Sequence, residues 1–116
     1  MFLDDTYILT GPTAPALNRI KNRVSNLVRH SRWFYIGLTN RPWERFCEHN
    51  RNDGIVWDRM VLLYTTTSLA KEGLFEQELI QYYRESRFGR KLKNIQSGAQ
   101  GRLGVPPHYI YVLLKY

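Results

Sequence analysis

Segments with the hydrophobic period of a strand alternate along this chain with segments that have the period of a helix. Residues 33–38 alternate strictly, which predicts a half-buried strand with Tyr35 on the face opposite Phe34 and Ile36. Further β-rich runs are predicted strands, at residues 6–9, 60–66 and 109–114. Apolar residues recur at helical spacing in two predicted helices, at residues 14–30 and 69–87. A cap candidate and the early-helix Pro42 predict a third, short helix at residues 43–51. The order β-α-β-α-β-α-β predicts an α/β (α+β) fold, a small mixed sheet flanked by helices.

The length of the chain predicts one domain. A chain of 116 residues falls inside the usual single-domain range, and no internal repeat or linker divides it. We therefore expect a single domain over residues 1–116. Within it, the helix at residues 14–30 has a basic outer face, and residues 88–107 are rich in Gly, Lys and Arg without a period, which predicts a surface loop.

The charge balance favours a polyanionic partner. The sequence has 17 Lys and Arg against 10 Asp and Glu, a formal net charge of +7, which suits nucleic acid or an anionic membrane surface. No apolar run approaches the roughly 20 residues of a membrane-spanning helix, and the first residues lack the layout of a signal peptide. We therefore expect a cytoplasmic protein without a membrane partner. Cys47 is the only cysteine, which excludes an internal disulfide and a thiolate zinc cluster.

One acidic residue falls where the predicted helix at residues 69–87 should be apolar. On a helical wheel that advances about 100° per residue, Glu76 lies inside the apolar arc with Phe75 and Leu79. Glu78 lies on the opposite side, where a solvated carboxylate costs nothing. A buried carboxylate needs a cation, a metal ion or several hydrogen-bond donors. A structural pairing with an internal arginine or a tyrosine hydroxyl would explain Glu76 equally well.

Several residues occur in an order that resembles the motifs of the GIY-YIG nuclease superfamily. A strand that contains Tyr-Ile-Gly at residues 35–37 is followed by Arg45 on a helix, with His49 one turn beyond. Glu76 lies on the next long helix and is followed one turn later by an apolar pair. Such a pair follows the catalytic glutamate in the family, so the resemblance selects Glu76 over Glu78, in agreement with the helical wheel. Asn94, ahead of the glycine-bearing loop, closes the pattern.

The first tyrosine motif departs from the family pattern. In the family, Gly-Ile-Tyr stands shortly before the Tyr-Ile-Gly strand, whereas the nearest candidate here, Asp5-Thr6-Tyr7, lacks the glycine and lies much further upstream. We interpret the basic helix at residues 14–30 as an insertion between the two strands, as in some restriction enzymes of this superfamily. On this interpretation Tyr7 is the first catalytic tyrosine.

The resemblance implies a metal-dependent DNA endonuclease. Glu76 would hold one Mg²⁺ or Mn²⁺ ion, and Arg45 would bind the scissile phosphate and stabilise its transition-state charge. Tyr7 and Tyr35 are the candidates for the general base and its helper. His49 would either hydrogen-bond a tyrosine or activate water directly. An ordinary structural role is the alternative for each of these residues, and for the asparagine that closes the pattern.

Basic side chains gather around the predicted loop and could follow the phosphates of DNA. The candidate nucleic-acid-binding residues are Arg41, Arg84, Arg87, Arg90, Lys91, Lys93 and Arg102. A solvated helix end explains Arg84 and Arg87 equally well.

Two other functions fit the same sequence. A nuclease-like fold that grips nucleic acid without cutting would account for the incomplete first motif, although the presence of both Arg45 and Glu76 argues against it. A small interaction protein whose charge serves an acidic protein partner is the second alternative. For an enzyme, sequence specificity would come from the inserted helix, the basic loop or a homodimer. Restriction, homing, repair and phage-encoded nicking are all open as biological roles.

Overall fold

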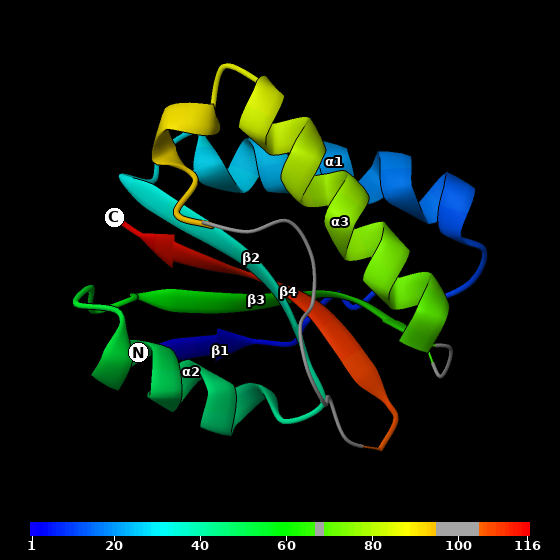
Figure 1. The fold of residues 1–116 in the computed structure, drawn as a ribbon, viewed down its shortest axis with the longest axis horizontal. Coiled ribbons are helices and arrows are strands. Elements are labelled where there is room, and N and C mark those ends of the chain that lie inside the picture. Colours follow the sequence, from blue (N-terminus) through cyan, green and yellow to red (C-terminus); the bar gives the residue numbers. More distant parts are fainter. Residues whose placement is uncertain (67–68, 95–104) are drawn as a thin grey trace.

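The strands take an order in the sheet that differs from their order in the sequence. The computed structural model describes residues 1–66, 69–94 and 105–116, and in this part of the chain the strands form one four-stranded sheet with the order β1-β3-β4-β2. The elements are β1 (Phe2–Asp4), α1 (Thr13–Val28), β2 (Trp33–Thr39), α2 (Pro42–Asn52), β3 (Arg59–Thr66), α3 (Leu69–Glu85), η1 (Gly89–Lys91) and β4 (His108–Lys115). β1 and β3 are parallel, whereas β4 is antiparallel to both β3 and β2. β4 therefore lies in the middle of the sheet, between β3 and β2 (Figure 1).

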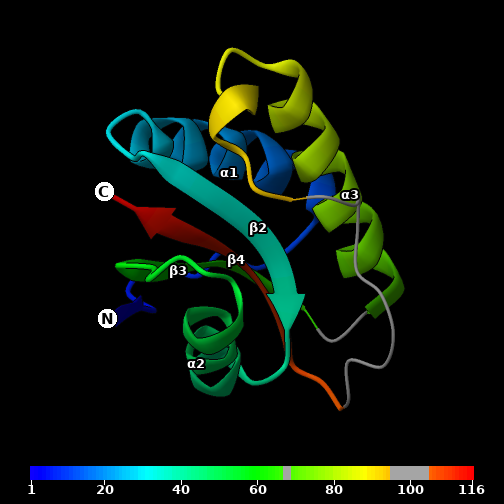
Figure 2. The ribbon, with the colours of Figure 1, turned by 60° about the vertical axis from the view of Figure 1, so that its left-hand side comes forward.

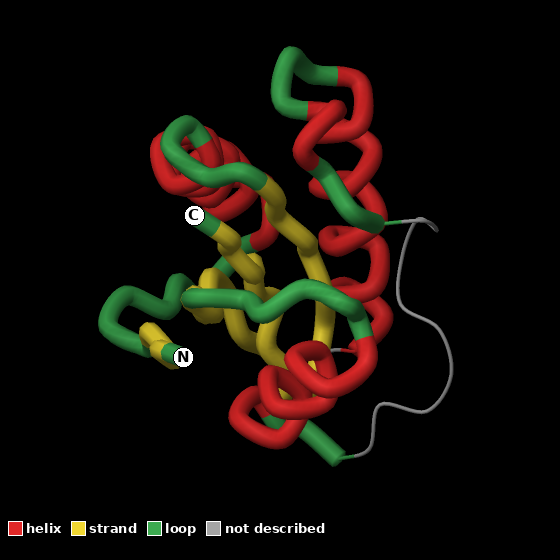
Figure 3. Tube along the Cα trace, turned by 90° about the vertical axis from the view of Figure 1, so that its left-hand side faces the viewer, coloured by secondary structure: helices red, strands yellow, loops and turns green. Residues whose placement is uncertain are grey.

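The helices cover both faces of the sheet. α1 and α3 lie on one face and α2 lies on the other (Figures 1 and 2), and the end-on view in Figure 3 shows the sheet between them. The core on the α1 and α3 side contains Phe34 and Ile36 of β2, whereas Tyr35 packs against the core on the α2 side. These layers confirm the predicted α/β (α+β) fold and the predicted alternation in β2. Among the described helices, none is long and apolar enough to cross a membrane.

The first strand lies earlier in the chain than the sequence predicts. The prediction placed it at residues 6–9, but β1 ends at Asp4, and Leu9 forms only an isolated bridge with Tyr64. The Asp4 carboxylate accepts a hydrogen bond from the backbone N–H of Thr6 at 3.0 Å. Because this local bond competes with strand pairing, the chain bends directly after β1.

The other predicted elements are present with small shifts at their ends. α1 is an integral part of the main core, where Ile20, Val24 and Val28 are fully buried. The predicted loop at residues 88–107 contains the short helical turn η1, and residues 95–104 of this loop lie outside the described part of the chain.

An ion pair ties β1 to β3. The Asp4 carboxylate accepts a hydrogen bond from the Arg59 guanidinium, and only 8% of the Asp4 side chain is exposed. Burial alone would raise the pKa of Asp4, but the hydrogen bonds from Arg59 and Thr6 outweigh it and lower the pKa from 3.8 to about 2. A carboxyl group whose pKa is lower in the folded state stabilises the fold above its unfolded pKa, and this stabilisation is lost as the pH falls through the folded pKa.

We expect Asp4→Asn to lower the free energy of unfolding by on the order of 2 kcal/mol at neutral pH. The difference from the wild type should shrink as the pH falls from about 4 to about 2, because the wild-type carboxylate is then protonated. Denaturant unfolding across this pH range measures both quantities, with the exposed neighbour Asp5→Asn as the control. A difference that is the same at both ends of the range would contradict the role of the ion pair.

Candidate functional site

Two tyrosines from neighbouring strands lie on the same side of the sheet. In the antiparallel pair of β2 and β4, Tyr111 lies opposite Gly37, two positions along the strand from Tyr35. The rings of Tyr35 and Tyr111 are stacked, with centroids 6.4 Å apart and planes inclined by 25°. Both tyrosines belong to the packing on the α2 side of the sheet. β4 therefore brings to Tyr35 a second tyrosine, which is not among the site residues predicted from the sequence.

Gly37 leaves the space that the Tyr111 ring occupies. A Cβ atom at Gly37 would lie 2.3 Å from both Cζ and Oη of Tyr111. A side chain at this position would therefore have to displace the ring or move the strands apart, since Gly37 is paired within the sheet. The close approach of β4 explains why a glycine follows Tyr35-Ile36.

We expect Gly37→Ala to lower the free energy of unfolding by about 1–3 kcal/mol, because the added methyl group overpacks a filled site. Gly73→Ala is the matched control, since a Cβ atom at Gly73 of α3 has nothing within 4 Å. That substitution should stabilise the helix by roughly 0.5–1 kcal/mol. Thermal unfolding of the two variants should show changes in stability of opposite sign. A Gly37→Ala protein as stable as the wild type would show that the Tyr111 ring has room to move.

α2 presents Arg45 and His49 to the two tyrosines from positions one turn apart. His49 is buried, its Nε2 lies 2.8 Å from the hydroxyl of Tyr111, and its ring centroid lies 4.7 Å from that of Tyr35. The guanidinium of Arg45 interacts electrostatically with Tyr111, and its Nη1 donates a hydrogen bond to Oε2 of Glu48 at 3.0 Å. The helix therefore places a cation and an imidazole against the same pair of phenols.

Burial controls the protonation of the tyrosines. Burial raises the pKa of Tyr111, and it also raises the pKa of Tyr35, while the nearby Arg45 opposes both shifts without cancelling them. Burial lowers the pKa of Arg45, but its interactions with Tyr111 and Glu48 outweigh this and raise the pKa above the usual value. At neutral pH the site therefore contains a guanidinium cation beside two neutral hydroxyl groups.

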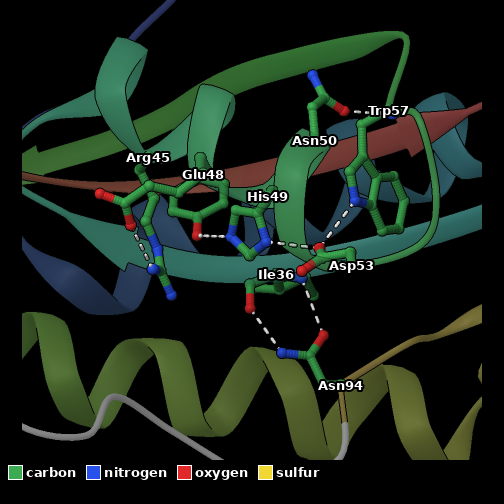
Figure 4. Close-up of polar contacts among 9 residues, drawn as sticks. Ile36, Arg45, Glu48, His49, Asn50, Asp53, Trp57 and Asn94 are labelled. Carbon is green, nitrogen blue, oxygen red and sulfur yellow. Dashed lines mark hydrogen bonds and ion pairs between the residues drawn. The ribbon is translucent and has the colours of Figure 1, made fainter.

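Asp53, the C-cap residue of α2, holds the second ring nitrogen of His49. Its Oδ2 lies 2.6 Å from Nδ1 of His49 and accepts a hydrogen bond from the indole N–H of Trp57 at 2.9 Å. Figure 4 shows this chain of contacts from Trp57 through Asp53 to His49. Burial lowers the pKa of His49 although Asp53 raises it, so the imidazole is neutral at neutral pH.

Glu76 of α3 interacts electrostatically with the two tyrosines. It is buried, with 3% of its surface exposed, and its charge contributes to the raised pKa values of Tyr35 and Tyr111. Glu78, two positions further on, is exposed. The helical-wheel prediction that separates these two acids is therefore confirmed, and the buried one interacts electrostatically with both phenols.

Asn94 acts on the backbone of β2. Its Oδ1 accepts a hydrogen bond from the N–H of Ile36 at 2.9 Å, and its Nδ2 donates to the carbonyl of Ile36 at 2.7 Å (Figure 4). The backbone N–H of Lys93 donates to the carbonyl of Phe34 at 2.8 Å. Because β2 is an edge strand, these bonds satisfy backbone groups that would otherwise face outward. Asn94 thus holds the strand that carries Tyr35.

The structure places Tyr7 away from the other predicted site residues. Its surface is 71% exposed, and the guanidinium of Arg23 lies over its ring, 5.8 Å from the centroid. Tyr111 of β4, and not Tyr7, is the tyrosine whose ring stacks near that of Tyr35. A signal for Tyr111 was present in the sequence, since it follows Ile110 in a predicted strand and so repeats the Ile-Tyr of the family motif.

Several of the predicted phosphate-binding residues have contacts within the fold. Arg84 donates a hydrogen bond to the carbonyl of Asn94 at 3.3 Å, and the Nζ of Lys93 lies over the Trp33 ring, 3.6 Å from its centroid. The Nζ of Lys91 donates to the carbonyl oxygens of Val28 and Arg29, at 3.0 and 3.2 Å, and so caps the C-terminal end of α1. Arg102 lies outside the described residues. The candidates other than Lys91 and Arg102 are exposed and can reach solvent, namely Arg41, Arg84, Arg87, Arg90 and Lys93.

Comparisons with known proteins add no relative. A scan against protein-family models, a search of curated proteins and a search of solved structures each find no match. In the part of the chain that the structure describes, no group of three or more His, Cys, Asp or Glu side chains is placed to hold a metal ion.

Proposed function

We propose that this protein is a metal-dependent DNA endonuclease of the GIY-YIG type, with Tyr111 as its first-motif tyrosine. The observation that carries the proposal is the convergence of side chains from four separate elements, β2, β4, α2 and α3, on one pair of phenols. They supply a guanidinium for a phosphate, an imidazole, two hydroxyls and a buried carboxylate. Titratable groups with shifted pKa values that converge in this way are candidates for an active site.

The proposal changes the order of the motifs relative to the family. Tyr109-Ile110-Tyr111 resembles Gly-Ile-Tyr in its Ile-Tyr pair, with a tyrosine in place of the glycine. It lies on β4, which pairs directly with the Tyr-Ile-Gly strand. The first motif would therefore follow the others along the chain instead of preceding them. Such a change of order is compatible with the same arrangement of strands, because neighbouring strands are held together by hydrogen bonds and need not be consecutive in the sequence. On this interpretation α1 need not be an insertion.

Arg45 is the residue best suited to bind the scissile phosphate. Its planar guanidinium matches phosphate oxygens in geometry and stays charged at every relevant pH. Its side chain is 42% exposed, so an incoming phosphate has access to it while one edge stays with Tyr111 and Glu48. Charge that grows on the phosphoryl oxygens in the transition state would then meet a fixed cation.

Glu76 is the residue that would hold a divalent ion. Its carboxylate is buried and interacts electrostatically with the two tyrosines. Mg²⁺ or Mn²⁺ prefers oxygen ligands and retains much of its water, so that one protein carboxylate can suffice. The donor set therefore fits such an ion. When bound, the ion would neutralise charge on the phosphoryl and leaving-group oxygens.

Supercoiled plasmid provides the test of this function. Purified protein is incubated with plasmid in Mg²⁺ or Mn²⁺, and in EDTA, and the nicked and linear forms are followed on a gel. We expect conversion only when the metal ion is present. Plasmid that is retarded on the gel but never cut would overturn the nuclease and favour the nuclease-like binding module. Plasmid that is neither cut nor retarded would overturn both the nuclease function and the nucleic-acid-binding function.

A further inference from the structure

We propose that Tyr111, His49 and Asp53 form a proton relay, in which Asp53 is a positioning residue for His49. This inference rests on the proposed nuclease function, because the relay serves the water that attacks the phosphate. The motif pattern assigns no role to Asp53. Its role follows from the contacts that fix which nitrogen of His49 carries the proton.

The contacts of Asp53 determine the tautomer of His49. Oδ2 of Asp53 accepts a hydrogen bond from Trp57, whose indole nitrogen can only donate, and the same oxygen lies 2.6 Å from Nδ1 of His49. An ionised carboxylate only accepts hydrogen bonds, so Nδ1 of His49 carries a proton. Since the pKa of His49 is lowered by burial, the ring is neutral at neutral pH. Its Nε2 is therefore an acceptor.

The hydroxyl of Tyr111 must then donate to His49. It lies 2.8 Å from Nε2, which has no proton to give. The Arg45 guanidinium, which can only donate hydrogen bonds, interacts electrostatically with the same hydroxyl. The oxygen of Tyr111 thus donates its proton to His49 and keeps its lone pairs as acceptors. A lone pair can accept a hydrogen bond from a water molecule.

This direction of hydrogen bonding solves a difficulty of a tyrosine base. Burial raises the pKa of Tyr111, so a free phenolate is scarce at neutral pH. In the relay, the proton of the attacking water passes to the oxygen of Tyr111 while the proton of Tyr111 passes to Nε2 of His49. The water oxygen forms its bond to phosphorus, and the bond from phosphorus to the leaving sugar oxygen breaks. Solvent protonates the sugar oxygen, and the His49 imidazolium returns its proton to solvent in a later step.

The Asp53 carboxylate stabilises the imidazolium that forms, in the way that the aspartate of a serine-protease triad does. The charged and titratable groups that surround His49 come from its own helix and from the two strands packed against it. They are Arg45, Glu48 and Asp53 of the α2 segment, Tyr35 of β2 and Tyr111 of β4. Among these groups of the described part of the chain, only Asp53 places an oxygen atom against Nδ1 of His49.

Two substitutions at Asp53 separate its geometric role from its charge. In Asp53→Asn the amide oxygen can occupy the position of Oδ2, where it accepts from both Trp57 and His49, so the tautomer is kept and only the charge is lost. In Asp53→Ala the acceptor itself is lost, so Nδ1 is no longer fixed as the donor. Glu44→Gln is the matched control, because it removes an exposed carboxylate from the first turn of the same helix.

The first measurement is nitrogen-15 NMR of histidine-labelled protein, with the His49 signals identified by their loss in His49→Gln. In the wild type we expect the proton on Nδ1 and an unprotonated Nε2. In Asp53→Asn this tautomer should persist while the pKa of His49 falls, because a charge that raises it is gone. In Asp53→Ala the preference for the Nδ1 proton should be lost. A residue that only stabilised the fold would leave the tautomer and the pKa of His49 unchanged.

The second measurement is metal-dependent plasmid cleavage by the same proteins. We expect a fall of about 10²- to 10⁴-fold for Asp53→Ala, as for loss of the orienting aspartate in a catalytic triad, a smaller fall for Asp53→Asn, and no change for Glu44→Gln. A proton on Nε2 in the wild type, or full cleavage by Asp53→Ala, would overturn the relay. The expected tautomers together with no cleavage by the wild type would support the role of Asp53 in positioning His49 and overturn the nuclease function.

Discussion

Glu76→Gln is expected to reduce metal-dependent plasmid cleavage by roughly 1000-fold or more, because the loss of a metal ligand removes several kcal/mol of transition-state stabilisation. Glutamine keeps the size of the side chain and one oxygen acceptor, but it has no charge to hold a divalent ion. DNA binding measured in EDTA should be unchanged, since the phosphate contacts proposed for Arg45 do not depend on the metal ion. Initial rates at several metal concentrations would show whether the lost activity is partly restored when the ion is in excess.

The stability of this variant distinguishes a functional acid from a structural one. A carboxylate that is buried to hold a metal ion loses hydration on folding, so its replacement by an amide should leave the free energy of unfolding unchanged or raise it. A structural ion pair would instead lose on the order of 3–5 kcal/mol when one partner is removed. Glu78→Gln is the matched control, since Glu78 lies two positions away on the exposed side of α3. A Glu76→Gln protein that is strongly destabilised but cuts at the normal rate would contradict the role of Glu76.

Local patterns were enough to predict the elements and part of the site. The alternation of Phe34, Tyr35 and Ile36 correctly placed the tyrosine on the face away from the main core. The helical period of α3 correctly separated buried Glu76 from exposed Glu78. Both inferences succeed because they use only the geometry of one element, in which the spacing of residues along the chain sets the face on which each one lies.

Contacts between elements were not predictable in the same way. Tyr111 lies beside Gly37 because β4 enters the middle of the sheet, and no local period shows which strands pair. Asp53 lies one turn beyond His49, so that contact follows from helical spacing, whereas the contact of Asp53 with Trp57 depends on how the next segment folds back. Tyr7 was chosen by its place before the Tyr-Ile-Gly strand, whereas the tyrosine that lies beside Tyr35 in the sheet is Tyr111 of β4.

Tyr111→Phe is expected to lower plasmid cleavage by about 10²- to 10⁴-fold, the range for loss of a positioned acid-base group. Phenylalanine keeps the ring that stacks near Tyr35 and fills the space beside Gly37, but it removes the oxygen between His49 and Arg45. The buried Nε2 of His49 loses its partner, which should lower the free energy of unfolding by about 1–3 kcal/mol. Circular dichroism and thermal unfolding would show that the variant is folded under the assay conditions.

Two other tyrosines make the result specific. The hydroxyl of Tyr83 on α3 is also buried, and it donates to the carbonyl of Lys21 at 2.5 Å. Tyr83→Phe should therefore cost a similar amount of stability without changing the cleavage rate, since it leaves the site intact. Tyr7→Phe should change neither property, because Tyr7 is largely exposed.

If Tyr7→Phe abolished cleavage while Tyr111→Phe retained it, the motif order of the family would hold and the assignment of β4 as the first-motif strand would fail. The reverse result would mean that the active site is assembled by strand pairing in the sheet, with the first motif placed after the others in the chain.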